Sequence, residues 1–156
     1  MPKRPRIGDI VELRTSQGLA YAQYTHKHTA PPVYGELIRV LPHIHPSRPC
    51  SFADLVSQKE LFFVFFPLGS AVRRNIVTLV GNMEVPDRCR EFPLFRTGFR
   101  APDTGRVDKW WLWDGKREWP IGELTPEQRE LPVRECINDT LLVERIVSGW
   151  LPQQEV

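Results

Sequence analysis

Alternating apolar and polar positions predict β-strands in the first 40 residues. The segments at residues 10–14, 19–25 and 34–41 are short, rich in β-branched and aromatic types, and separated by turn signals. Ser16-Gln17-Gly18, between the first two segments, is typical of a hairpin loop. Three consecutive strands of this kind predict a strongly bent sheet or a small barrel.

The middle of the chain contains two further apolar runs. Residues 61–66 (LFFVFF) are continuously apolar and aromatic, which predicts a central buried strand. Residues 75–80 (NIVTLV) predict another strand. Residues 86–102 show no regular pattern, and their three phenylalanines are expected to hold this segment against the body of the protein. These are Phe92, Phe95 and Phe99.

The clearest hairpin signal lies at residues 107–121, where Asp114-Gly115 separates two aromatic runs. An Asp-Gly pair favours a type I′ turn, in which both central residues take a positive φ. A longer loop that includes Lys116 is the alternative, and it would shift the register of the two strands.

Capping signals predict three short helices, which begin near Ser51, Thr125 and Asp139. Thr125 and Gln128 form a capping box, and Pro132 is expected to end that helix within two turns. Gly149 is expected to end the last helix. We therefore predict a single α+β domain over residues 1–156. It consists of a bent, mainly antiparallel β-sheet or partial barrel with two or three short helices, including a C-terminal helix.

Composition agrees with this class. The 156 residues are 41% hydrophobic and 26% charged, and the 15 prolines favour short elements. The longest apolar run, at residues 61–68, is shorter than the roughly 20 residues needed to span a bilayer. No apolar segment follows the basic residues 1–6, so we expect these to be a flexible tail of a cytoplasmic protein rather than a signal peptide.

Cysteines and common catalytic motifs give little evidence for an enzyme. Cys50, Cys89 and Cys136 are far apart and form no CxxC pair, so we expect reduced thiols, with a catalytic or metal-bound cysteine as the alternative. The chain contains no P-loop, GxGxxG, HExxH, GxSxG or zinc-finger spacing. An enzyme of these common classes is therefore not expected.

Two His-x-His pairs are the strongest indication of metal chemistry. On a strand, residues two apart point the same way, so the members of a pair could bind one ion. Zn or another divalent metal would then activate a water in a hydrolase of phosphoester-type substrates. The alternative is that these histidines are exposed and bind nothing. They are His26, His28, His43 and His45.

Tryptophans suggest a protein-binding surface. Four of them fall within ten residues, and Trp110-Trp111 must point to opposite faces of a strand. Either the strand is buried on both faces, or one face is exposed and binds a partner. Residues 81–156 carry 11 basic and 14 acidic residues, whereas residues 1–80 carry ten and five, and an acidic surface could occlude a basic toxin. The predicted contact residues are Trp110, Trp111, Trp113, Asp114, Glu118 and Tyr24.

Tyrosines near basic residues suggest a third function. Tyr24 lies near His26 and Lys27, and aromatic and basic residues on a small barrel can hold single-stranded nucleic acid. Because Glu12 and Glu36 interrupt the few basic residues, nucleic-acid binding is the weakest of the three hypotheses.

Three strand sequences resemble a known family. The segments GDIVE at residues 8–12, GLAYAQY at residues 18–24 and YGELIRV at residues 34–40 resemble the N-terminal part of the family 26 immunity proteins. These are small bacterial proteins of mostly β or α+β build, found in polymorphic toxin systems, and some carry a phosphotriesterase-type name. A chain of 156 residues is too short for the (β/α)8 barrel of the phosphotriesterases. The resemblance implies a non-enzymatic cytoplasmic protein that neutralises a cognate toxin by occluding its active site.

Overall fold

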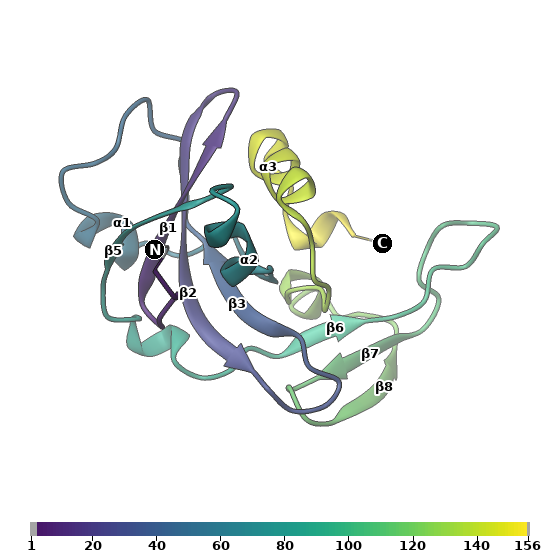
Figure 1. Ribbon diagram of the computed structural model, residues 1–156. Coiled ribbons are helices and arrows are strands. Elements are labelled where there is room, and N and C mark those ends of the chain that lie inside the picture. Colours follow the sequence, from purple (N-terminus) through teal and green to yellow (C-terminus); the bar gives the residue numbers. More distant parts are fainter. Residues whose placement is uncertain (1–2, 156) are drawn as a thin grey trace.

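The structure is a computed structural model that describes residues 3–155. The larger of its two sheets has five antiparallel strands (Figure 1). The strands lie in the order β4-β3-β2-β1-β5, and the sheet does not close into a barrel. The predicted meander is confirmed in its first three strands. The bounds are β1 (Asp9–Thr15), β2 (Gly18–His28), β3 (Gly35–Val40), β4 (Phe62–Phe65) and β5 (Thr78–Asn82).

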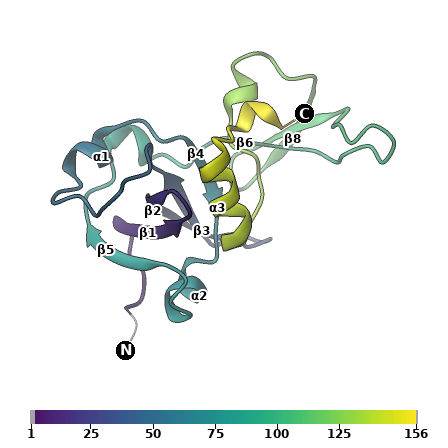
Figure 2. The same ribbon diagram turned by 90° about the horizontal axis from the view of Figure 1, so that it is seen from above.

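A second sheet of three antiparallel strands lies beside the first (Figures 1 and 2). Its order is β6-β7-β8, and β7 with β8 forms the predicted hairpin. The fold is therefore α+β, as expected from the sequence. The bounds are β6 (Phe95–Thr97), β7 (Trp110–Trp113) and β8 (Glu118–Gly122).

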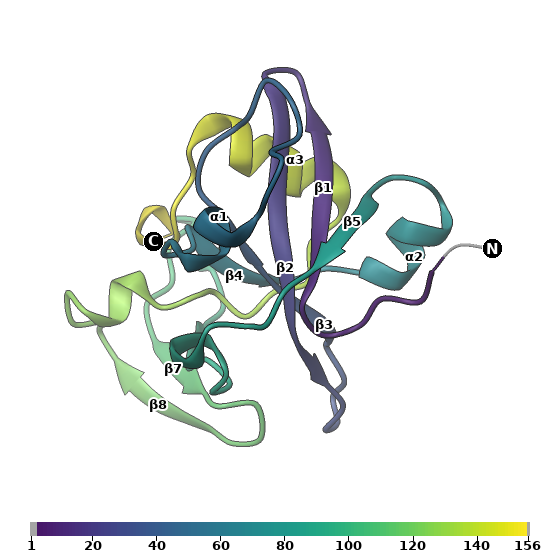
Figure 3. The same ribbon diagram turned by 90° about the vertical axis from the view of Figure 1, so that its left-hand side faces the viewer.

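Helices cover both faces of the large sheet. The α-helices are α1 (Ala53–Ser57), α2 (Leu68–Arg73) and α3 (Asp139–Ser148), and single 3₁₀ turns occur at Asp87–Cys89, Gln128–Glu130 and Pro152–Gln154. Leu142 and Ile146 of α3 share a core with Val11 and Ile38 of the sheet, and α2 contributes to the same core. Leu55 of α1 packs on the opposite face. Figure 3 shows α1 in front of the strands and α3 behind them.

Two predictions about strands are wrong. β4 is buried as expected, but it lies at the edge of the sheet rather than at its centre. Its burial comes partly from a later segment, because Phe65 N–H donates to the Glu135 carbonyl (3.3 Å) and Ile137 N–H donates to the Phe65 carbonyl (3.0 Å). Residues 86–102 also contain a strand, β6, which the sequence pattern does not reveal.

The turn between β7 and β8 is longer than a type I′ turn. Trp113 pairs with Glu118, so the loop has four residues, and Asp114 N–H donates to the Arg117 carbonyl (3.1 Å). Gly115 takes a φ of 100°, whereas Asp114 is not in the positive-φ region. The alternative loop that includes Lys116 is therefore the one formed.

The capping predictions are partly confirmed. Thr125 and Gln128 exchange the two hydrogen bonds of a capping box (2.9 and 3.2 Å), but only a single 3₁₀ turn follows. Asn138 rather than Asp139 caps α3, and Gly149 ends this helix with a φ of 72°. Within the described residues, no helix has the length and apolar character needed to cross a membrane.

Candidate functional site

Trp113 belongs to an aromatic core that joins the two sheets. Its ring is 4% exposed and contacts Phe95 of the small sheet and Phe65 of the large sheet, with ring centroids 5.4 and 6.0 Å away. The Arg134 guanidinium lies 5.2 Å from its centroid. Trp113 is therefore a core residue, and its ring is not accessible to a partner.

Trp110 is also buried, at 7% exposure, because Arg96 lies over its ring at 4.5 Å. Arg96 is fully buried, and it donates to backbone carbonyls that include those of Leu131 (3.3 Å) and Pro152. Burial lowers the pKa of Arg96 to about 10, so the guanidinium stays charged at neutral pH. Strand β7 is thus buried on both faces at Trp110 and Trp113. Of the two alternatives stated for this strand, these positions fit burial on both faces rather than an exposed binding face.

Trp111 and Trp119 are the tryptophans of the hairpin that reach solvent. Trp111 is half-buried, and Trp119, on the edge strand β8, is 39% exposed. Trp119 is not among the contact residues predicted from the sequence.

The two acidic residues predicted for contact are exposed, and both have structural partners. Asp114 accepts the backbone N–H groups of Arg117 (2.8 Å) and Lys116 (2.9 Å), which hold the pKa of its carboxyl below the usual value. Glu118 forms an ion pair with Arg134 at 2.8 Å. Asp114 therefore stabilises the turn of the hairpin and Glu118 attaches its edge strand to Arg134, although both carboxylates are also exposed.

Phe99 is the most exposed large apolar residue among those described, at 94% exposure. It lies in the loop of residues 98–109, which projects away from the sheets (Figures 1 and 2). The expectation that Phe99 packs against the body is wrong, because its ring is in solvent and the outer part of the loop folds back on itself. Ala101 N–H donates to the Arg106 carbonyl (2.7 Å) at its base. The turn-forming residues 102–105 (PDTG) are the feature of the sequence that indicates a projecting loop.

Tyr24 lies apart from the tryptophans. It is 4% exposed and packs with the α2 and α3 core, whereas Trp113 belongs to the core that joins the sheets. Tyr24 lines a hollow of about 670 Å³ between the N-terminal segment and α2. The same hollow is lined by Lys3, Arg4 and Arg6 of the predicted basic tail, of which residues 1 and 2 lie outside the described residues.

His26 and His28 share one side of β2, as predicted. Both rings contact Phe92, at centroid distances of 5.6 and 5.8 Å. Each has protein partners for both ring nitrogens. The nitrogens of His28 contact Gly115 O (2.7 Å) and Tyr34 N–H (3.1 Å), and those of His26 contact Arg90 O (2.8 Å) and the Thr25 hydroxyl (2.9 Å). In each ring the nitrogen that faces a carbonyl carries the proton, and the lone pair of the other nitrogen accepts a hydrogen bond, so neither nitrogen offers a free lone pair to a metal ion.

The second pair lies at the other end of β2. His45 pairs with Leu19 at the start of that strand, and the step from Leu19 to His26 is about 23 Å at ~3.3 Å per residue. His43 contacts the Gln58 side chain (3.2 Å). The structure therefore does not bring the two His-x-His pairs together. Within residues 3–155, no group of three or more His, Cys, Asp or Glu side chains is arranged to hold a metal ion.

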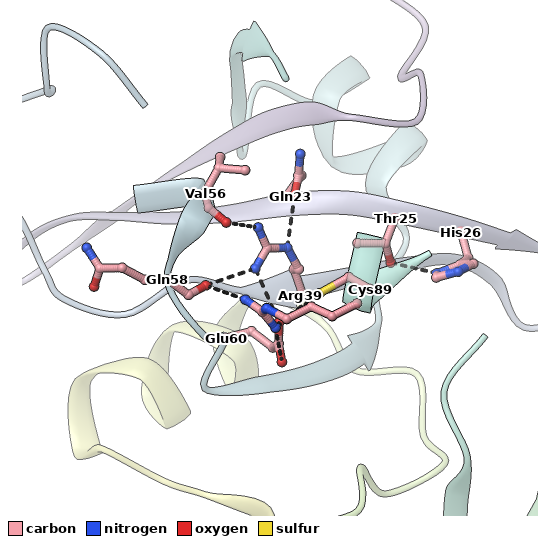
Figure 4. A network of polar contacts seen from close by, with 9 residues as sticks. Gln23, Thr25, His26, Arg39, Val56, Gln58, Glu60 and Cys89 are labelled. Carbon is pink, nitrogen blue, oxygen red and sulfur yellow. Dashed lines mark hydrogen bonds and ion pairs between the residues drawn. The ribbon is translucent and has the colours of Figure 1, made fainter. Parts of the chain in front are cut away.

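A buried polar network, which the sequence analysis did not predict, lies on the α1 side of the large sheet (Figure 4). Arg39 is fully buried, and its Nε donates to Gln23 Oε1 at 2.9 Å. Its terminal nitrogens donate to the carbonyls of Val56 (2.6 Å) and Gln58 (3.3 Å) and to the Glu60 carboxylate (3.2 Å). Four acceptors thus replace the water that burial removes from this guanidinium.

The same network holds Cys89 as a protonated thiol. Its sulfur is within 3.2 Å of Glu60 Oε1, to which the S–H donates. Burial, together with this carboxylate, raises the pKa of the Cys89 thiol. A protonated, 2% exposed thiol is a poor nucleophile, so the network has a structural role.

Together, the geometry describes an α+β protein in which His26, His28 and Cys89 form hydrogen bonds within the protein and the small sheet exposes aromatic rings. No family model, curated protein or solved structure matches this chain. The resemblance to the family 26 immunity proteins therefore stays a prediction from the strand sequences.

Proposed function

We propose that this protein is an immunity-type binding protein, which neutralises a cognate toxin protein in the cytoplasm by occluding the toxin's active site. The observation that carries the proposal is the exposure of Phe99. Its ring is 94% exposed on a loop that projects from the small sheet. Leaving an aromatic ring in water forgoes the free energy of burial, and aromatic rings are frequent anchors of protein interfaces.

The surroundings of Phe99 support a protein partner. Trp119 and Trp111 provide further aromatic surface on the small sheet. The segment of residues 98–117 carries five basic and three acidic residues, so its charges are mixed rather than purely acidic. Mixed charges around aromatic anchors favour recognition of one specific partner surface, whereas a purely acidic segment would be attracted to any basic surface. Occlusion by this loop would therefore be mainly steric.

The choice of a toxin as partner rests on the resemblance of the three N-terminal strand sequences to the family 26 immunity proteins. Those strands lie in the large sheet, away from the Phe99 loop. In this proposal the large sheet is the scaffold, and the small sheet with its loop carries the contact residues.

The test uses a candidate toxin encoded beside this gene, expressed alone and then with this protein. Co-expression is expected to restore growth. Phe99→Asp is expected to weaken toxin binding by about 30-fold or more, the effect of losing an interface anchor. Val33→Asp is the control, because Val33 is also apolar and 63% exposed but lies outside the small sheet and its loop.

Two results would overturn the proposal. One is full protection by Phe99→Asp at matched expression. The other is that no neighbouring gene product arrests growth or binds the purified protein. Phe99→Asp is expected to leave the free energy of unfolding unchanged within about 0.5 kcal/mol, so lost protection can be separated from lost folding.

A further inference from the structure

Five basic side chains surround the hollow beside the N-terminal segment. Lys3, Arg4 and Arg6 come from that segment, Lys27 comes from β2, and Arg73 comes from α2. Figure 3 shows the N-terminal segment running beside α2. The fold thus collects charges that are far apart in the sequence around one open volume of about 670 Å³.

These cations have no carboxylate partner within residues 3–155, although arginines elsewhere, such as Arg39 and Arg145, form ion pairs. One carboxylate, that of Glu36, also lines the hollow, and its Oε1 accepts the N–H of Gly69 at 3.2 Å. The lining therefore keeps a net positive charge. Unpaired like charges around one volume attract a multivalent anion and repel each other in its absence.

Tyr24 adds a hydrogen-bond donor to this lining. Its ring is packed in the core, and its hydroxyl has no hydrogen-bond partner within residues 3–155. Burial, together with the Glu36 and Asp9 carboxylates, raises the pKa of Tyr24 to about 12, so the hydroxyl keeps its proton at neutral pH. The hydroxyl oxygen itself is not sealed from solvent, so it can donate to an oxygen of a ligand in the hollow.

We infer that this hollow binds a phosphate-bearing anion with several charges, such as a polyphosphate group. The ammonium and guanidinium groups would face the phosphates, and the Tyr24 hydroxyl would donate to one phosphate oxygen. The lining offers no open aromatic face on which a nucleobase could stack, because the Tyr24 ring is buried. Recognition would thus depend on phosphate groups rather than on bases.

The test is calorimetric titration of the full chain with sodium tripolyphosphate at about 0.15 M salt, where weak surface attraction is screened. Saturable binding of one ligand per chain is expected. Arg73→Gln and Tyr24→Phe are each expected to weaken it about tenfold, since each loses a hydrogen bond to a charged group. Arg74→Gln is the matched control, because Arg74 is also exposed and is adjacent in sequence but does not line the hollow.

Three results would overturn the inference. They are no saturable binding by the wild-type chain, equal weakening by Arg74→Gln and Arg73→Gln, and binding of a single-stranded oligothymidine without binding of tripolyphosphate. Equal affinity for tripolyphosphate and adenosine triphosphate would support recognition of the phosphate groups alone. Thermal unfolding of each variant verifies that it is folded. The inference is independent of toxin binding, because the hollow and the Phe99 loop share no residue.

Discussion

Several individual charged side chains of this protein are buried in its core. Arg39 and Arg96 are fully buried and Glu12 is 6% exposed. Each has several partners, and Glu12 receives two hydrogen bonds from Arg48 (2.8 and 3.0 Å) and one from Tyr21 (2.8 Å). Strand alternation assigns such polar positions to the solvent side, so the sequence alone could not predict their burial.

Arg39 is expected to be the most sensitive of these positions. Arg39→Met leaves the Gln23 side-chain oxygen and the buried Val56 carbonyl without their donor, and removing one partner of a buried ion pair typically costs about 3–5 kcal/mol. Urea unfolding measures this loss. Lys59→Met, at an exposed position, is the control and should change the free energy of unfolding by less than about 0.5 kcal/mol. If Arg39→Met left the free energy of unfolding unchanged, the network would contribute no net stability.

Glu12 is expected to make the free energy of unfolding depend on pH in the acid range. The Arg48 hydrogen bonds hold the pKa of Glu12 below its ordinary value of 4.5, although burial opposes them. A carboxyl with a lower pKa in the folded state stabilises the protein above its unfolded pKa, and this contribution is lost as the pH falls through the folded value. The stability difference between wild type and Glu12→Gln should therefore shrink below pH 4.5.

Chemical unfolding at pH 7 and at several lower pH values measures this difference. Glu123→Gln, at an exposed position, is the control and should follow the wild-type pH dependence. If wild type and Glu12→Gln differed by the same free energy of unfolding across the acid range, the lowered pKa of Glu12 would be contradicted.

At the scale of elements, the cap of α3 shows how two adjacent candidates are resolved. Both Asn138 and Asp139 can cap a helix, but Asn138 has the extended backbone, with a ψ of 174°, and its Oδ1 accepts the Leu141 N–H at 2.9 Å. Asn138→Ala is expected to cost about 1 kcal/mol. Asp139→Ala should cost less, because it loses only a favourable interaction with the helix dipole. Thermal unfolding of both variants decides between them, and a larger loss in Asp139→Ala would contradict the assigned cap.

Element prediction succeeded where the pattern is local. Short apolar, β-branched and aromatic segments between turn residues located β1, β2 and β3, and Asp114-Gly115 located the hairpin but not its four-residue loop. The run at residues 61–66 could not reveal an edge position, because an apolar run looks the same whether a neighbouring strand or a distant segment buries it. β6 has only three residues and leaves no periodicity to detect.

Whether the candidate site residues are exposed and lie together depends on contacts between segments that are distant in sequence. Trp110 and Trp113 looked like contact residues, but Arg96 and the aromatic core cover them. The members of each His-x-His pair are close in sequence, yet β2 separates the pairs. The hollow near Tyr24 exists only because the N-terminal segment runs beside α2. Spacing along the chain specifies none of these arrangements.

At the scale of the whole molecule, residues 150–155 brace the small sheet. Pro152 and Glu155 provide carbonyl acceptors for Arg96, and the Glu155 carboxylate pairs with Arg100. The Trp150 ring anchors this segment to the large sheet, because it packs on Phe62 of β4 with a centroid distance of 5.2 Å. Removing residues 150–156 is expected to leave Arg96 buried with fewer acceptors. Hydrogen exchange should then accelerate by about tenfold or more in β6, β7 and β8 and less in β1 and β2.

A matched control for this truncation is Gln153→Ala, which changes an exposed residue of the same segment and should leave exchange unaltered. Equal acceleration in both sheets would contradict a local bracing role, because it would mean that the segment stabilises the whole fold uniformly.

The edge position of β4 also bears on how the chain reaches its folded state. The strand is strongly apolar, and residues 135–137, which pair with it, follow only after the entire small sheet along the chain. A folding intermediate that has formed the N-terminal meander but has not yet docked this segment exposes an unpaired apolar strand. Such strands template aggregation between chains. The yield of soluble protein should therefore depend on how fast residues 135–137 reach β4.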